Sequence, residues 1–384
     1  MSMVDLAREV SVSRQAISQY ENAQQTPSPD VLERIARILN YKTAFFTWPM
    51  PPMDRHGPMF WRSMASATKT ARERTSVPHE WLVDLRRYVS QWIEIPKVDF
   101  PSFDLPYDLE RLSDDAIDDL ATRTRRHWGM GDGPIANMVW LAENKGAVVA
   151  RLGLDADALD GQSQWIDERP HILLNADKCS AARSRFDVAH EIGHLVLHRG
   201  VDSGIVHRSA EHKLIEDQAN SFASALLLPQ KTFTAEVHAP SLDQFRMLKE
   251  RWKVSIGTML MRAVQLGLVA EKRAQYLWIS YSRKGWRKWE PLDDDLPVEQ
   301  PRLFRQALSA ILNNKLQVRE DALASVPIGQ GYMEELMGLE RGYFNLEEAE
   351  IVSLPKRADT IPVQNSGPRG DIIKFPGRAP QETR

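Results

Sequence analysis

The residues best suited to carry chemistry are two histidines and a glutamate in the pattern His190-Glu191-x-x-His194. Histidines four residues apart on a helix lie on one face, one turn apart, so both imidazoles can reach the same ion. Zinc lowers the pKa of a bound water to roughly 7, and a neighbouring carboxylate then suffices as a general base. The spacing therefore predicts a zinc-dependent peptidase centre in which His190 and His194 are ligands and Glu191 is the catalytic base.

A catalytic zinc usually keeps three protein ligands and one open position, so a third ligand is needed. The next predicted helix offers Glu216, which shares a helical face with Asn220. Residues 199–212 are long enough for the two helices to run antiparallel and bring Glu216 to the ion. Glu211 or Asp217 would take its place if the helical phase were different. Two histidines and a carboxylate favour zinc over manganese.

Four other residues near the motif are given structural roles. His198, His207 and His212 are each expected to be a solvated or hydrogen-bonded loop residue, although one of them could donate a hydrogen bond to the oxyanion of peptide cleavage. Cys179 is expected to be a small buried residue, because no supporting base has a defined place beside it. As the sole cysteine it excludes an internal disulfide and a cysteine-based zinc cluster, and it fits a reducing cytoplasm.

Two helices must position the predicted ligands. The first covers residues 180–198 with Ser180 as its cap, and the second covers residues 214–229; both carry apolar stripes at helical spacing. Apolar positions that anchor the first are Phe186, Ala189, Ile192, Leu195 and Val196, and those of the second are Ile215, Ala219, Phe222 and Leu226. Other predicted elements are a helix at 114–128, strands at 147–152 and 171–175, and a strand-like run at 276–281.

The first 48 residues are predicted to form short helices separated by polar turns. Ser2 and Asp5 form a variant of the capping box, Ser13 caps a second helix at residues 14–21, and Ser28-Pro29 begins a third. This block resembles a helix-turn-helix unit of the phage-repressor type, with the usual leading helix missing. The second helix of such a pair lies in the major groove. By position, the resemblance implies contacts to bases or phosphates from Arg14, Gln15, Ser18 and Gln19, with Ile17 in the core.

Charge gives little support for nucleic-acid binding. The formal net charge is −3, and basic and acidic residues balance within the first block, so no strong non-specific phosphate footprint is evident. A helical docking module for protein partners is the alternative for this block.

Taken together, the chain resembles the ImmA/IrrE family of metallo-endopeptidases fused to an N-terminal repressor-type (XRE) helix-turn-helix. The resemblance rests on Trp128-Gly129, Gly133 to Ile135, Ser180 to Asp187, His190 to His194, and Glu216 to Pro229. In that family the two histidines and the later glutamate bind zinc and the motif glutamate is catalytic. The same roles are implied for His190, His194, Glu216 and Glu191. The resemblance also implies that the substrate is a DNA-bound transcriptional repressor, and a tethered DNA-binding domain would raise the local concentration of such a target.

The expected fold class is α+β and mostly helical, with a small all-α domain followed by a zincin-like peptidase domain that has a small sheet. The predicted ranges are 1–48 for the helix-turn-helix DNA-binding domain, 49–113 for a linker and helical connector, 114–230 for the peptidase domain, 231–352 for a helical C-terminal region and 353–384 for a disordered tail. The chain is 42% hydrophobic and 26% charged, as soluble globular proteins are. The sequence has no signal peptide and no apolar run that would span a membrane, which predicts a cytoplasmic protein.

The leading hypothesis is a cytoplasmic zinc endopeptidase that regulates transcription by limited proteolysis. The alternatives are a DNA-binding transcriptional regulator whose metal domain is sensory or structural, and a toxin–antitoxin component. Glu191 favours the first, because a structural zinc site has no use for an extra carboxylate beside its ligands. A homodimer is left open, since helix-turn-helix proteins commonly pair on two half-sites.

Overall fold

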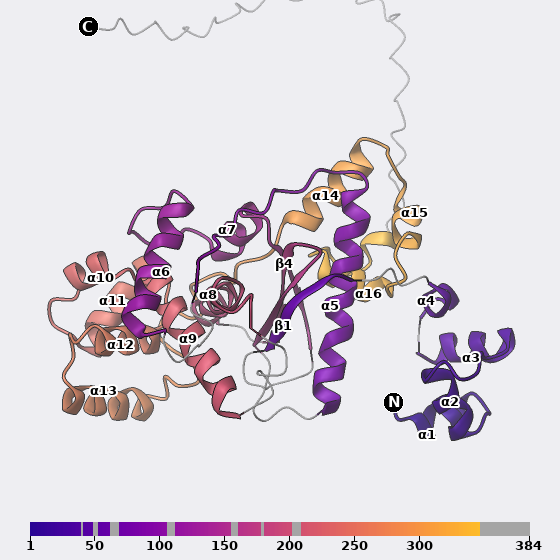
Figure 1. Ribbon diagram of the computed structural model, residues 1–384, viewed down its shortest axis with the longest axis horizontal. Coiled ribbons are helices and arrows are strands. Elements are labelled where there is room, and N and C mark those ends of the chain that lie inside the picture. The colour runs from indigo at the N-terminus through magenta and orange to yellow at the C-terminus, as the bar shows by residue number, and fades with distance from the viewer. Residues whose placement is uncertain are drawn as a thin grey trace, which may run out of the picture. The chain divides into compact units, whose positions relative to one another are not determined.

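The computed structural model describes residues 1–39, 41–48, 53–61, 69–105, 112–154, 160–177, 180–201 and 209–345. Within these ranges the protein is mostly helical with one small sheet, as the fold class predicted (Figure 1). The chain divides into two units, Met1–Asn345 and Leu346–Arg384. The predicted tail at 353–384 lies outside the described residues, as do Cys179 and His207.

Four short helices open the chain: α1 (Met3–Glu9), α2 (Arg14–Glu21), α3 (Pro29–Leu39) and α4 (Thr43–Thr47). Both predicted caps are present. The Ser2 hydroxyl accepts the backbone N–H of Asp5 at 3.2 Å, and the Ser13 hydroxyl accepts that of Ala16 at 3.0 Å. A small core of buried side chains joins the first three helices. It consists of Ala7, Val10, Ile17 and Ile35.

The sheet has four strands in the order β1-β3-β4-β2: β1 (Arg55–Trp61), β2 (Val148–Leu152), β3 (Gly161–Ile166) and β4 (Arg169–Asn175). β3 is antiparallel to both β1 and β4, whereas β2 and β4 are parallel. The predicted strands at 147–152 and 171–175 are confirmed as β2 and β4, and the sequence did not indicate the other two. Asp167 and Glu168 turn β3 into β4 with positive φ values of 50° and 56°, the geometry of a tight type I′ hairpin.

Helices cover both faces of the sheet. On one face, β2 and β4 pack through Val149 and Leu174 into a core shared with α6 (Asp114–His127), α7 (Met138–Asn144), α8 (Ala181–Leu197) and α9 (Ser209–Leu227). On the other, Ala150 and Leu173 pack against α5 (Lys69–Ser90) and the last elements of the described chain. Those elements are α14 (Leu303–Asn313), α15 (Arg319–Ala324), α16 (Gln330–Leu336) and the 3₁₀ turn η4 (Tyr343–Asn345). Such alternation follows from the two-residue period of a strand.

The close approach of α8 to α9 depends on Gly193. A Cβ at this position would lie 3.2 Å from the carbonyl oxygen of Ala219 and 3.3 Å from its Cα. These contacts are with backbone, which cannot move aside as a flexible side chain can. The glycine between the two predicted histidine ligands therefore lets the second helix lie against the first.

Four further helices follow α9: α10 (Gln230–Glu236), α11 (Leu242–Trp252), α12 (Ile256–Gln265) and α13 (Glu271–Arg283). The predicted strand at 276–281 is wrong, because this run lies within α13. Its aromatic and β-branched side chains favour a strand, but the buried positions are Ala274, Leu277 and Tyr281. That spacing of three and four residues is helical, so tertiary packing overrides the local preference.

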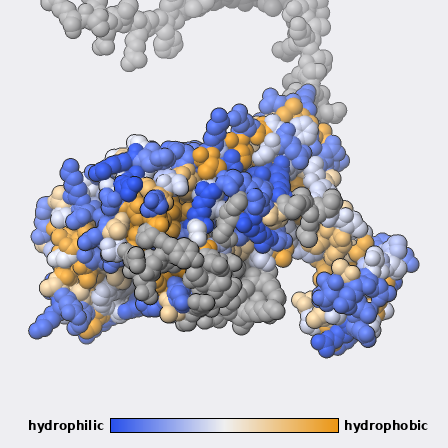
Figure 2. All heavy atoms as spheres, viewed as in Figure 1, coloured by the Kyte–Doolittle hydropathy of each residue, from blue (hydrophilic) through white to orange (hydrophobic). Residues whose placement is uncertain are grey.

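No helix in the described part of the chain is long and apolar enough to cross a membrane. Hydrophilic residues cover most of the face seen in Figure 2, and hydrophobic residues form separate groups on it.

Candidate metal centre

The three predicted ligands lie together at the contact between α8 and α9. Glu216 Oε2 is 3.4 Å from His190 Nε2, Glu216 Oε1 is 3.3 Å from His194 Nε2, and the two Nε2 atoms are 2.9 Å apart. Tetrahedral zinc with bonds of roughly 2.0–2.2 Å separates its ligand atoms by roughly 3.3–3.6 Å. The nitrogen–oxygen distances fit this range, and a small outward movement of the imidazoles brings the third into it. The residues present therefore fit a zinc ion.

Neither alternative third ligand belongs to the group formed by the two histidines. Asp217 is exposed and its carboxylate pairs with Lys213 at 2.7 Å, one helical turn away. Glu211 lies in the first turn of α9, and only Glu216 forms a metal-sized group with the two histidines among the described residues.

A hydrogen bond fixes the orientation of the His190 ring. Its Nδ1 lies 3.0 Å from Asn220 Oδ1, so Nδ1–H donates to the amide oxygen. The unprotonated nitrogen is then Nε2, which faces Glu216 and His194. Metal-binding histidines commonly have such a partner on the other ring nitrogen. Asn220, one turn after Glu216 on α9, therefore links the third ligand's helix to the first ligand's ring.

A longer relay fixes His194. Its Nδ1 is 3.1 Å from His198 Nδ1, and His198 Nε2 is 3.0 Å from Gln218 Oε1. Because the Gln218 oxygen can only accept, His198 donates from Nε2 and accepts at Nδ1. His194 must then donate from Nδ1, which leaves Nε2 as its ligand atom. His198 was expected in a loop, but it caps the C-terminal end of α8 and is fully buried. His212, also expected in a loop, lies in α9.

The protonation states of the centre suit a metal. Burial lowers the pKa of His194 to about 4 and that of His198 to about 3, so both rings are neutral at pH 7. Burial alone would raise the pKa of Glu216, but hydrogen bonds and charge interactions with His190 and His194 outweigh it and hold that pKa well below its usual range. The site therefore presents a neutral His194 imidazole and a Glu216 carboxylate anion, the states in which these groups bind a metal.

Strand β3 holds the predicted base. Ser163 Oγ donates to Glu191 Oε2 at 2.5 Å, and both residues are fully buried. Gly161 lies beside the other oxygen, since a Cβ there would be 3.2 Å from Glu191 Oε1. Ser163 and Gly161 were not among the predicted site residues, because β3 was not predicted.

An aromatic ring from a distant part of the chain covers His194. The Phe60 ring in β1 stacks on the imidazole with centroids 4.5 Å apart and planes 4° from parallel. Phe60 is 2% exposed and also packs on Ile215, next to the third ligand. No feature of the sequence around Phe60 indicated this contact.

A cleft of about 810 Å³ adjoins the centre on the side of Asn220. Its walls come from α8 and α9 and from the loop and helices that follow α11. Asn220 and Gly257 are among the residues that line it. Its volume lies within the range of ligand-binding clefts in proteins, about 300–1,000 Å³.

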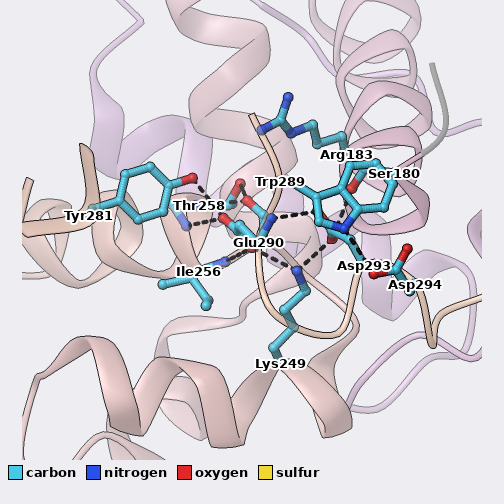
Figure 3. A network of polar contacts seen from close by, with 12 residues as sticks. Ser180, Arg183, Lys249, Ile256, Thr258, Tyr281, Trp289, Glu290, Asp293 and Asp294 are labelled. Carbon is cyan, nitrogen blue, oxygen red and sulfur yellow. Dashed lines mark hydrogen bonds and ion pairs between the residues drawn. The ribbon is translucent and has the colours of Figure 1, made fainter. Parts of the chain in front are cut away.

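A buried ion-pair network joins the cleft wall to α8 (Figure 3). Lys249 Nζ donates to Glu290 Oε2 at 2.8 Å and to Asp293 Oδ1 at 2.6 Å, with all three side chains at most 1% exposed. Glu290 also accepts the backbone N–H groups of Ile256 and Gly257, at 2.8 and 3.0 Å. Ser180 occupies the N-cap position of α8, as predicted, but its hydroxyl donates to Asp293 at 3.1 Å and makes no capping bond.

The predicted DNA-contact residues share the short helix α2. Arg14 and Gln15 are exposed in its first turn, and Ser18 and Gln19 are half-buried one turn later. Ile17 is 2% exposed and belongs to the domain core, as expected. Contact with DNA remains a prediction for these four residues.

A fold with a small mixed sheet, a helix carrying His190-Glu191-x-x-His194 and a carboxylate on the next helix defines a metallopeptidase-like protein. Residues 142–264 match the family model of the IrrE N-terminal-like domain of peptidase family M78, and residues 1–46 match that of a helix-turn-helix domain. The chain thus carries an IrrE N-terminal-like domain with a DNA-binding helix-turn-helix domain before it. The group His190, His194 and Glu216 falls within the first match. No curated protein matches the chain.

Proposed function

We propose that this protein is a zinc endopeptidase that regulates transcription by limited cleavage of a DNA-bound repressor, and that its own N-terminal domain binds DNA sequence-specifically. The observation that carries the proposal is the buried carboxylate of Glu191. It lies directly after His190 and three residues before His194, is not needed as a ligand, and accepts a hydrogen bond from Ser163 at 2.5 Å. A purely structural metal site gains nothing from such a group.

Each residue of the metal centre has a separate role in the proposed peptide cleavage. His190, His194 and Glu216 would hold the zinc ion, which supplies Lewis-acid activation of the water and of the scissile carbonyl when bound. Glu191 accepts a proton from the attacking water and delivers it to the leaving nitrogen. Ser163 orients the Glu191 carboxylate, while Asn220 and His198 hold the two imidazoles in the ligating tautomer. The cleft beside Asn220 receives the peptide.

The N-terminal domain supports a substrate that is itself bound to DNA. A peptidase domain tethered to a DNA-binding module meets targets on neighbouring DNA at a raised effective concentration, without any new contact between enzyme and substrate. A repressor fits this geometry because it stays on its operator until it is cut.

Elemental analysis tests the centre first. We expect close to one zinc per chain in the wild type and in Glu191→Gln, and little in His190→Ala or Glu216→Ala, because only the last two lose a ligand. Wild-type protein without zinc after reconstitution would contradict the proposal.

Mapping of new protein N-termini in cells tests the reaction. Cells expressing the wild type should contain a cleaved DNA-binding protein that is intact in cells expressing Glu191→Gln. Equal cleavage in both strains would remove Glu191 from the mechanism.

One observation favours a second function, a DNA-binding regulator with a structural or sensory metal. Both histidines are fully buried and Phe60 covers one of them, as in a closed structural site. Under this alternative, Glu191→Gln would regulate its target genes as the wild type does.

A further inference from the structure

Strand β1 lies outside the part of the chain that matches the family model. It covers Arg55–Trp61, whereas the family match begins at residue 142 and contains the other three strands. Among these three, β4 lies between β2 and β3, so β3 is a terminal strand. In this protein β1 pairs with the outer side of β3, and the sheet gains a strand from the segment that follows the helix-turn-helix domain.

The edge that β1 occupies is the one nearest the catalytic base. Phe60 lies opposite Ser163, and Trp61 lies opposite Gln162, in antiparallel register. Ser163 is the residue that holds Glu191. An extended peptide commonly binds by adding to a free strand edge, where main-chain hydrogen bonds provide affinity and side-chain pockets provide specificity. A peptide bound to β3 in this way would present its backbone beside the metal centre.

The side chain of Phe60 fills a pocket at that edge. Its ring stacks on His194, lies 5.7 Å from the centre of the His198 ring, and packs on Ile215. The walls of the pocket are therefore the predicted metal ligand His194, its hydrogen-bond partner His198, and Ile215, which precedes the third ligand in sequence. Its shape and chemistry suit an aromatic or other large apolar side chain.

The pairing of β1 with β3 is interrupted. Two residue pairs form at each end, and the register shifts between His56 and Phe60. Such an irregularity leaves part of the ladder without regular bonds and is typical of strands whose pairing ends or changes locally. Phe60, whose ring contacts His194 and Ile215, therefore helps to anchor this end of the strand.

We propose that β1 occupies the place of the substrate: it is an intramolecular strap, and it leaves β3 when a substrate segment adds to the same edge. The substrate is then an extended segment that places a large apolar, preferably aromatic, residue where Phe60 now lies. The inference rests on the proposed function only for the identity of this segment as a substrate. Occupation of the edge by β1 explains how a peptidase with a buried centre is kept from indiscriminate cleavage.

Peptide binding tests the strap without cleavage. The probe is a fluorescein-labelled peptide with the sequence of Arg55–Trp61, and its affinity is measured by anisotropy with full-length, zinc-loaded protein. In the Glu191→Gln background, Phe60→Ala should bind the probe at least ten times more tightly than the Glu191→Gln parent does, because the strap has lost its anchor.

Met59→Ala is the matched control, since Met59 is adjacent and also buried but its side chain does not stack on His194. A probe with alanine in place of its phenylalanine should bind Phe60→Ala no more tightly than it binds the parent protein. Equal affinity of Phe60→Ala and its parent overturns the proposal.

Hydrogen–deuterium exchange provides a second measurement with the Phe60 side chain intact. Saturating probe should speed exchange of residues 55–61 in the Glu191→Gln protein, because β1 is displaced, and should leave residues 161–166 protected. Bound probe with unchanged exchange in residues 55–61, or no binding at saturating concentration, overturns the strap. Because neither measurement requires catalysis, absence of cleavage by the wild type would count against the proposed function and leave the strap standing.

Discussion

At the scale of single residues, the centre depends as much on hydrogen-bond partners as on ligands. The relay from Gln218 through His198 determines which nitrogen of His194 is unprotonated. Asn220 does the same for His190 in one step. A ring free to choose its tautomer would spend part of its time with a proton on the ligating nitrogen, and metal affinity would fall accordingly.

We expect His198→Phe to weaken zinc binding by about 10–100-fold, because it keeps the buried ring but removes the acceptor for His194 Nδ1–H. Competition with a chromophoric chelator measures this affinity directly. His238→Phe is the control, since His238 is exposed and outside the relay. Equal zinc affinities for the wild type and His198→Phe would show that the His194 ring needs no partner.

The ligands could be predicted from sequence and their partners could not. His190, His194 and Glu216 follow from helical spacing, which is local. Ser163 and Phe60 reach the centre from strands far away in the chain, so only the folded structure brings them there. His198 follows the motif closely, but its role depends on Gln218 of another helix. A histidine one turn after a ligand, on the same helical face, was the one available signal.

At the scale of elements, the strands show the limits of local patterns. β2 and β4 have apolar runs and were predicted. β3 contains Gln162, Ser163 and Gln164, all buried, so its composition resembles that of a loop. β1 contains Gly57 and Pro58, which disfavour strands and fit an edge position. Of these residues, Ser163 contacts Glu191 beside the metal ligands, a role that the composition of the strand did not indicate.

The packing of α5 on the sheet makes stability depend on pH. His79 of α5 and His171 of β4 are fully buried, with ring centroids 6.2 Å apart. Burial lowers the pKa of His79 to about 3, and it lowers that of His171 well below the usual value, with the charge of His79 adding to the effect. Below about pH 6.5 these two histidines take up protons in the unfolded chain but stay neutral in the folded chain. The free energy of unfolding therefore decreases as the pH is lowered from 7 to 5.

Between pH 7 and pH 5, we expect the free energy of unfolding of His79→Leu to decrease by about 2 kcal/mol less than that of the wild type, since one pKa unit corresponds to about 1.4 kcal/mol. Urea denaturation of the wild type and the variant at both pH values measures the difference. His127→Leu removes a half-exposed histidine and serves as the control. Parallel pH curves for the wild type and His79→Leu would mean that His79 is protonated equally in both states.

At the scale of the whole molecule, the helix-turn-helix domain and the peptidase-like domain have separate hydrophobic cores. The helix-turn-helix domain has its own small cluster around Val10 and Ile17, and none of the metal-centre residues belongs to it. The fold class and both domain types were predictable because each is marked by a local motif. The ranges predicted for the connector and the C-terminal region stay predictions, since no local motif marks where a domain ends.

We expect Arg14→Ala with Gln15→Ala to lower affinity for specific DNA by at least tenfold and to leave the zinc content unchanged, because a good bidentate base contact contributes about 1–3 kcal/mol. The duplex is one selected by the wild type from a random-sequence pool, and anisotropy measures binding. Arg37→Ala, at an exposed position of α3, is the control. Undiminished binding by the double variant would place the DNA contacts elsewhere or favour a protein-docking role.

The Lys249 network has a consequence for what counts as an independent folding unit. The family match ends at residue 264, but Glu290 and Asp293 lie beyond it and supply both carboxylates that neutralise the buried Lys249. A chain cut at residue 264 would lose both carboxylates that pair with Lys249, and Ser180 at the start of the metal-binding helix would lose its hydrogen-bond partner Asp293. The family match therefore does not contain all the residues that stabilise this part of the protein. The helix that carries His190 is held at its first turn by Asp293, a residue outside the family match. In this protein the end of the match is therefore not the end of the folding unit.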